Sequence, residues 1–290
     1  MLTASAAIKS SAPAVSFPAP TLSGKIVYRL CPVRKKTVMD NLSLVFGDRL
    51  SAAEIKRLAQ SFYSHLFKLV AENLSRAWMS EERMLSRVRV VGHEHLAKAF
   101  EKNRGILLLT GHFGNWEFTP VAAIAHFKEF RGRFHVLRKL LANKFFEKIL
   151  FRRFYKAGLT VIPKKNSLDH VLSALERNDI VAFIMDQYAN PSKDGILVDF
   201  FGRKAGTFKS LALIARETGA PVIPAICYRE AGGTHVMRFS EPVPWMENDD
   251  ADAEIAENTR GYNRILENMV LEHPDQWLWA HRRWKTKGFK

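Results

Sequence analysis

One short stretch constrains the fold of this chain more than any other. An apolar run over residues 106–109 leads directly into Thr110, Gly111 and His112. Consecutive apolar residues that end at turn-forming residues are typical of a strand buried on both faces, so this run predicts an inner strand of a parallel sheet. Open α/β sheets place their chemistry at the carboxyl ends of such strands. We therefore expect this strand to deliver His112 to a functional edge of an α/β sheet.

From residue 88 to the end of the chain, strand-like and helix-like segments alternate. Short apolar or β-branched runs predict further strands, and segments with apolar residues at helical spacing lie between them. The other predicted strands cover residues 88–91, 134–137, 159–162, 180–185, 221–228 and 236–239. This alternation predicts an α/β fold with a largely parallel central sheet flanked by helices.

The preceding part of the chain is predicted to be helical. Residues 23–80 carry apolar residues at helical spacing, and Ser51 and Glu54 have the spacing of a capping box. Two packing helices and a membrane-inserting hairpin both fit this pattern. Because no internal linker is visible, we expect a single domain over residues 23–290. Residues 1–22 are rich in Ala, Ser and Pro, and they predict a flexible tail.

Residues 143–157 form the clearest amphipathic segment. Cations recur at every fourth position along one face, and apolar side chains follow the opposite face. The cationic face consists of Lys144, Lys148, Arg152 and Lys156, and the apolar face of Phe146, Leu150 and Phe154. An ordinary surface helix fits this pattern, and so does a helix that lies near a membrane surface or an acidic carrier protein.

The charge of the chain predicts an anionic partner. With 44 Lys and Arg against 29 Asp and Glu, the formal net charge is +15. Nucleic acid, anionic lipid headgroups and an acidic carrier protein all meet that description. No base-stacking motif or glycine-rich nucleic-acid signature is visible, so we expect no nucleic acid. The 20 Phe and 6 Trp fit a protein that handles apolar chains, or one with a large core.

Cysteine usage and hydropathy bear on the compartment. Cys31 and Cys227 give neither a zinc spacing nor a disulfide framework, which favours a reducing, cytosol-facing compartment. The 10 His show no convincing ligand cluster, so we expect neither a metal nor a cofactor. No apolar run approaches the roughly 18 to 20 residues of a transmembrane helix. We therefore expect peripheral or monotopic membrane attachment and no secretory signal.

His112 and Glu117 form the candidate catalytic pair. On one continuous helix their side chains would point about 140° apart. They can meet only if His112 lies on a turn and Glu117 lies in the first turn of a helix that starts near Asn115. A carboxylate bonded to an imidazole fixes its tautomer and stabilises the protonated ring, which makes the histidine a better general base toward a hydroxyl. A histidine that only packs or caps the helix is the alternative.

The residues around this pair fit direct transfer. Gly111 and Gly114 permit tight turns and close approach of a substrate, and backbone N–H groups near Asn115 are expected to hold a developing oxyanion. No serine stands in a G-x-S-x-G turn and neither thiol lies near a histidine in the sequence, so a covalent nucleophile is not indicated. We expect the base to deprotonate an acceptor hydroxyl, which then attacks a bound thioester.

The stretch H-F-G-N-W-E from His112 to Glu117 resembles the H-x4-[D/E] motif of the glycerolipid acyltransferase superfamily. Further blocks, in matching order between residues 34 and 285, resemble its late branch, the bacterial lipid A biosynthesis acyltransferases. The blocks are Arg34-Lys-Lys with Asn41, Leu42 and Phe46; Arg138 with Asn143 and Gly158; Met185-Asp-Gln; Phe200-Phe-Gly with Thr207; Val222-Ile-Pro; and the ending P-D-Q-W-L-W-A-H-R-R-W-K from Pro274 to Lys285.

This resemblance implies acyl transfer from an acyl carrier protein or CoA thioester to a hydroxyl of a lipid or glycolipid, at the cytoplasmic face of the bacterial inner membrane. His112 would be the base and Glu117 its partner, and Arg138 a ligand of an acceptor phosphate. The residues implied to bind substrate are Arg138, Asn143, Asp186, Gln187, Thr207 and Arg282.

The family usually carries an N-terminal transmembrane anchor that this sequence does not show, so acceptors other than lipid A stay open. Within the same fold, the alternative is a lysophospholipid acyltransferase that uses a glycerol backbone. The alternative in a different class is a non-catalytic basic protein that binds membranes or nucleic acid.

Overall fold

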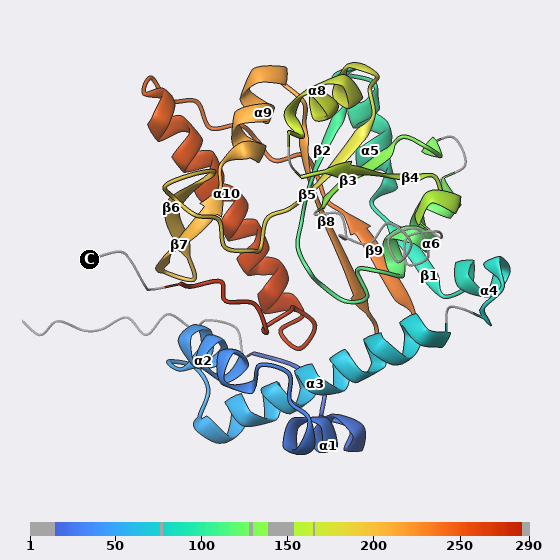
Figure 1. Ribbon diagram of the computed structural model, residues 1–290, viewed down its shortest axis with the longest axis vertical. Helices are drawn as coiled ribbons and strands as arrows, with labels where there is room; N and C mark the ends of the chain where they lie inside the picture. The colour runs from blue at the N-terminus through green and yellow to red at the C-terminus, as the bar shows by residue number, and fades with distance from the viewer. Residues whose placement is uncertain (1–14, 76–77, 128–129, 139–153, 165, 286–290) are drawn as a thin grey trace, which may run out of the picture.

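The computed structural model describes residues 15–75, 78–127, 130–138, 154–164 and 166–285. Its centre is a seven-stranded sheet in the order β1-β9-β8-β2-β5-β3-β4 (Figure 1). The strands are β1 (Val88–Val91), β2 (Ile106–Thr110), β3 (Phe134–Arg138), β4 (Leu159–Pro163), β5 (Ile180–Ile184), β8 (Val222–Arg229) and β9 (His235–Phe239). All neighbouring strands run parallel except β8 and β9. The α/β fold with a largely parallel sheet is thereby confirmed.

The strand β2 lies between β8 and β5, at the centre of the sheet. Ile106 and Leu108 belong to one hydrophobic core, which includes α5 and α6, whereas Leu107 and Leu109 belong to a second core, which includes α8, α9 and α10. The helices of the sheet domain are α4 (Glu81–Leu85), α5 (His93–Phe100), α6 (Thr119–His126), α8 (Leu168–Glu176), α9 (Ser210–Thr218) and α10 (Ala251–Glu272). This strand is apolar at successive positions because helices cover both of its faces.

The N-terminal helices are α1 (Leu22–Leu30), α2 (Lys35–Phe46) and the long α3 (Ala52–Ser75). In Figure 1, α3 runs below the sheet, with α1 beneath it. The expected capping box opens α3, because the Ser51 N–H donates to the Glu54 carboxylate (2.8 Å) and the Glu54 N–H donates to the Ser51 hydroxyl (3.3 Å). In the part of the chain that the structure describes, no helix combines the length and the apolar character needed to cross a membrane.

Residues 15–22, which were expected to belong to a flexible tail, have defined contacts instead. The Thr21 N–H donates to the Ser64 hydroxyl of α3 (3.0 Å). The Thr21 side chain caps α1, which begins at Leu22. Val15 and Phe17 pack against the core, so apolar contacts hold a segment whose composition alone predicted a tail.

Two elements differ from the prediction. The helix expected to start near Asn115 begins at Thr119, with Pro120 in its first turn, where a proline is well tolerated. Strands β6 (Gly195–Phe200) and β7 (Arg203–Phe208) form an antiparallel hairpin that was not predicted as strands. Most of the predicted amphipathic helix over residues 143–157 lies outside the described residues, which resume at residue 154.

Candidate active site

The site is built on the turn that joins β2 to α6, residues 111–118. The C-terminal segment runs alongside this turn and fixes its backbone. The Leu278 N–H donates to the His112 carbonyl oxygen (3.0 Å), and the Gly114 N–H donates to the Gln276 carbonyl oxygen (3.0 Å). Phe113 and Trp277 form an isolated antiparallel bridge between these two hydrogen bonds. The chain end therefore shapes the turn that carries His112.

Asp186 is the carboxylate that holds His112. Its Oδ1 lies 2.9 Å from Nδ1 of the ring, and its Oδ2 accepts the His112 backbone N–H at 2.7 Å. Trp277 donates its indole N–H to the same Oδ2 (2.9 Å). Asp186 follows β5, which is the parallel neighbour of β2. The sequence proposed Glu117 as the partner of the ring, but the hydrogen bond at Nδ1 belongs to Asp186.

Electrostatics favour a protonatable His112 beside an ionised Asp186. Burial alone raises the pKa of the Asp186 carboxyl, but the charge of His112 and the hydrogen bonds from His112 and Trp277 lower it to about 2. For His112, burial lowers the pKa, yet attraction from Asp186 and, more weakly, from Glu117 outweighs burial, and the net pKa is raised. Glu117 thus acts on the ring through its charge, from a position before α6 rather than within it.

Gln187 contacts the second nitrogen of His112, and His281 contacts the same Gln187 amide. The amide nitrogen of Gln187 lies 3.4 Å from His112 Nε2 and 3.3 Å from His281 Nε2. The centroids of the two imidazole rings are 5.2 Å apart. Gln187 was predicted as a site residue. No role was assigned to His281, although it belongs to the C-terminal block.

An apolar cavity starts at His112 and Gly111. It encloses about 840 Å³ of empty space, its open mouth included. Its lining comes from β2, β3, β5, β8, β9, α6 and Phe154, and includes Trp116, Ala182, Ile184, Phe127, Phe134 and Phe239. Most of its walls are apolar side chains, which suits an apolar ligand.

The two glycines are required by close approach. A Cβ on Gly111 would lie 3.0 Å from Asp186 Oδ2 and 2.8 Å from the Phe113 ring. Gly114 has a positive φ of 52°, and a Cβ there would lie 2.5 Å from the Cys227 carbonyl oxygen. Glycine at both positions thus lets the turn pack between Asp186 and the end of β8.

Two of the residues predicted near the oxyanion, Gly114 and Asn115, have contacts within the protein. The Gly114 N–H is bonded to the Gln276 carbonyl, as described above. The Asn115 side chain donates to Glu72 (2.8 Å) and accepts the Phe118 N–H (3.1 Å). The Gly114 N–H is therefore already paired and the Asn115 side chain holds the turn, whereas an oxyanion role of the Asn115 backbone N–H stays a prediction.

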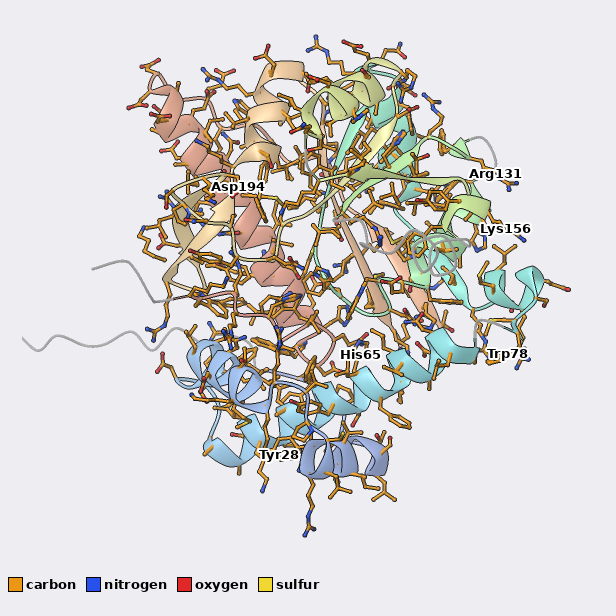
Figure 2. All side chains as sticks on the ribbon, viewed as in Figure 1. Tyr28, His65, Trp78, Arg131, Lys156 and Asp194 are labelled. Atoms are coloured by element: carbon orange, nitrogen blue, oxygen red, sulfur yellow. The ribbon has the colours of Figure 1, made fainter. Side chains whose placement is uncertain are left out.

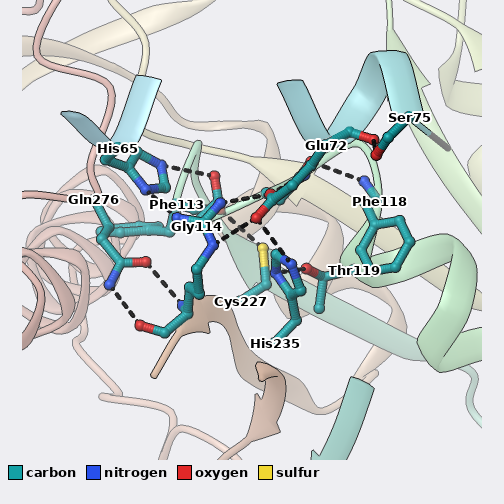
Figure 3. Close-up of polar contacts among 12 residues, drawn as sticks. His65, Glu72, Ser75, Phe113, Gly114, Phe118, Thr119, Cys227, His235 and Gln276 are labelled. Carbon is teal, nitrogen blue, oxygen red and sulfur yellow. Dashed lines mark hydrogen bonds and ion pairs between the residues drawn. The ribbon is translucent and has the colours of Figure 1, made fainter. Parts of the chain in front are cut away.

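Behind the turn lies a buried polar cluster (Figure 3). Glu72 receives two hydrogen bonds from the Arg229 guanidinium (2.8 and 2.5 Å). His65 approaches Arg229 through Nδ1 (3.0 Å) and the Gly114 carbonyl oxygen through Nε2 (3.1 Å). Figure 2 marks His65 on α3, below the sheet. Burial and the charge of Arg229 lower the pKa of His65 to about 3, so it is neutral here.

The other predicted residues are dispersed. Arg138 ends β3, beside β5, and thus lies at the same edge of the sheet as Asp186. Asn143 lies outside the described residues. Thr207 is fully buried in β7, where its hydroxyl accepts from Arg283 (2.8 Å), so it is not a substrate contact in this structure. Arg282 is exposed.

Arg283 is the arginine that reaches the site. It is fully buried, and its guanidinium donates to the carbonyl oxygens of Gln187 (3.2 Å) and Gly206 (2.6 Å). The sequence did not distinguish it from Arg282, since which of two adjacent side chains points inward depends on packing. Within the described ranges, no group of three or more His, Cys, Asp or Glu side chains is placed to hold a metal ion.

Comparison with known proteins assigns the family. The bacterial lipid A biosynthesis acyltransferase family matches residues 15–286. A lipid A biosynthesis lauroyltransferase from Escherichia coli K12 is 25% identical over 91% of this chain and 83% of its own. An E. coli K12 lipid A biosynthesis palmitoleoyltransferase is 25% identical over 88% and 79%, and a phosphatidylinositol mannoside acyltransferase from Mycolicibacterium smegmatis is 22% identical over 84% and 77%. The chain is therefore an acyltransferase of the bacterial lipid A biosynthesis acyltransferase family.

Proposed function

We propose that this protein moves a fatty acyl chain from a thioester to a hydroxyl group of a lipid or glycolipid, with His112 as the general base. The observation that carries the proposal is the position of the His112–Asp186 pair at the wall of the apolar cavity. The cavity offers room for a hydrocarbon chain, and the pair offers a proton acceptor beside it. A reactive thioester at the end of such a chain would then lie next to the base.

In the proposed step, His112 Nε2 takes the proton of the acceptor hydroxyl while its oxygen attacks the thioester carbonyl carbon. A C–O ester bond forms, the C–S bond breaks, and the proton passes from His112 to the leaving thiolate. Asp186 on Nδ1 keeps the lone pair on Nε2 and stabilises the imidazolium between the two proton transfers. Glu117 adds electrostatic attraction to the same charge.

The partners follow from charge and from the relatives. An acyl carrier protein or CoA thioester is the proposed donor, because both are anionic and the chain carries a net charge of +15. Arg138 is the proposed ligand of an acceptor phosphate, which a guanidinium binds in a bidentate manner. The relatives named for lipid A and for phosphatidylinositol mannoside support a glycolipid acceptor.

We place the reaction at the cytoplasmic face of the bacterial inner membrane. Action at a membrane surface is supported by an apolar outer face on α3, where Phe67, Val70 and Leu74 are exposed. At about 100° per residue these three point away from Glu72, which faces the site. Exposed apolar side chains also line α1, at Leu22, Ile26 and Leu30, next to the exposed Lys25 and Arg29. Apolar side chains flanked by cations suit an anionic lipid surface.

The test is transfer by the purified full chain. Lauroyl-CoA and a lauroyl-acyl carrier protein would be offered with three acceptors: a lipid A precursor, a phosphatidylinositol mannoside and lysophosphatidate. Ester product measured by mass spectrometry with a glycolipid acceptor supports the proposal. Preference for lysophosphatidate would show that the acceptor is a glycerol lipid and not a glycolipid. Salt-sensitive binding of nucleic acid without thioester turnover would overturn the proposal.

A further inference from the structure

We propose that Gln187 and His281 form a positioning pair that presents the acceptor hydroxyl to His112. This inference rests on the proposed function and concerns the second nitrogen of the base. Because Asp186 occupies Nδ1 of His112, only Nε2 can take a proton from a substrate. The groups around Nε2 therefore decide where a hydroxyl can stand.

The Gln187 amide bridges the two imidazole rings. Its nitrogen lies within 3.4 Å of His112 Nε2 and 3.3 Å of His281 Nε2. An amide NH₂ group has two hydrogens and no lone pair to offer, so both imidazole nitrogens face it as acceptors. For His112 this agrees with a proton on Nδ1, toward Asp186. Burial, the largest cause, lowers the pKa of His281, which favours the neutral ring that an acceptor requires.

An arriving hydroxyl can enter this arrangement without leaving a group unsatisfied. To react, the hydroxyl must donate its hydrogen to His112 Nε2, the same acceptor toward which one hydrogen of the Gln187 amide points. The hydroxyl oxygen has two lone pairs, so it can accept that same hydrogen after a small shift of the amide. The Gln187 amide thus donates one hydrogen to the oxygen of the acceptor hydroxyl. Its other hydrogen stays bonded to His281.

Backbone contacts fix both members of the pair. The Gln187 carbonyl oxygen accepts from the buried Arg283 (3.2 Å), and the His281 carbonyl oxygen accepts from Asn41 of α2 (2.7 Å). Asn41 also donates to the Trp279 carbonyl oxygen (2.8 Å), and Arg34 to that of Ala280 (3.2 Å). The C-terminal segment is thereby held against α2, and the two side chains are placed before substrate arrives.

The test compares a replacement that keeps an acceptor with one that removes it. His281→Gln retains a carbonyl oxygen for the Gln187 amide, whereas His281→Leu does not. With lauroyl-CoA as donor and the best acceptor from the panel above, we expect His281→Leu and Gln187→Leu to raise the KM of the acceptor about tenfold. The KM of the donor should stay within twofold, and His281→Gln should restore most of the acceptor affinity. His170→Gln, an exposed histidine of α8, is the matched control.

An unchanged acceptor KM in His281→Leu would overturn the proposed positioning role of the pair. A parallel loss of donor and acceptor affinity, with no rescue by His281→Gln, would overturn it too, because it would indicate a purely structural residue. If the unaltered protein forms no ester at all, the proposed function fails before this question arises.

Discussion

The turn after β2 has charged groups on both sides, and the two sides differ in what they leave open. On the side of His112, a buried carboxylate pairs with a ring that keeps one nitrogen for a substrate. On the side of Gly114, Glu72 and Arg229 satisfy each other through two hydrogen bonds, and His65 is neutral between Arg229 and the backbone. Buried charge alone therefore does not mark the chemistry. The proposed base differs from the Glu72 cluster because it also lines an apolar cavity.

Loss of the His112 side chain should have the largest effect on activity. His112→Ala removes the proposed base, so the rate of ester formation should fall by about 10²- to 10⁴-fold. The rate is measured as product per unit time at saturating donor. His170→Ala, on the surface of α8, should leave it unchanged. Full activity in His112→Ala would remove the proposed mechanism.

The second prediction concerns the other side of the turn. Glu72→Gln leaves the Arg229 guanidinium buried without its carboxylate, which should lower the free energy of unfolding by about 3 to 5 kcal/mol. Urea denaturation followed by circular dichroism measures this. Lys36→Ala removes an exposed ion pair with Asp40, and it should change the free energy of unfolding by less than about 1 kcal/mol. Equal effects of the two variants would contradict the role of Glu72 as the partner of the buried Arg229 guanidinium.

A third prediction sharpens the assignment of the cavity. Ala182 lies on β5 two residues before Ile184, and both side chains line the cavity. Ala182→Leu fills part of that space, so the preferred acyl chain should become shorter by a few carbons, with rates on short chains kept. A series of acyl-CoA donors of increasing length measures the shift. An unchanged preference would place the acyl chain elsewhere.

The smallest expected effect is on pH dependence. Glu117 helps to raise the pKa of His112, and the base works only when it is neutral. Glu117→Gln should lower that pKa, so the acidic limb of the rate profile should move to lower pH while Asp186 still holds the ring. The profile of kcat between about pH 5 and pH 9 measures this. A limb that moves to higher pH would contradict the electrostatic role of Glu117.

Much of the fold could be predicted from local patterns, because β2, β5 and β8 are apolar runs of strand length. The pairing of His112 with Asp186 could not, since nothing local states which strands are neighbours. In the structure, β2 and β5 run parallel with Thr110 opposite Ile184, so the residues two positions beyond each lie side by side. The resemblance placed Asp186 in the site but not on Nδ1.

Asn115 illustrates the same limit. Its spacing in the motif predicted a helix start and an oxyanion donor. The helix begins at Thr119 instead. The Asn115 side chain reaches Glu72 of α3, a contact that depends on how the N-terminal helices dock. Thr207 and Arg283 likewise form a buried cluster with each other, and only packing distinguishes Arg283 from its exposed neighbour Arg282.

The contribution of the chain end has a consequence for biosynthesis. Trp277, Gln276 and His281 come from the last part of the sequence, yet they complete the surroundings of a turn formed near residue 112. Chains fold from the N-terminus as they are made, so a nascent sheet would present its apolar cavity and His112 before these residues exist. The surroundings of His112 are thus complete only once residues 276 to 281 have been made, long after the strand that leads into the turn.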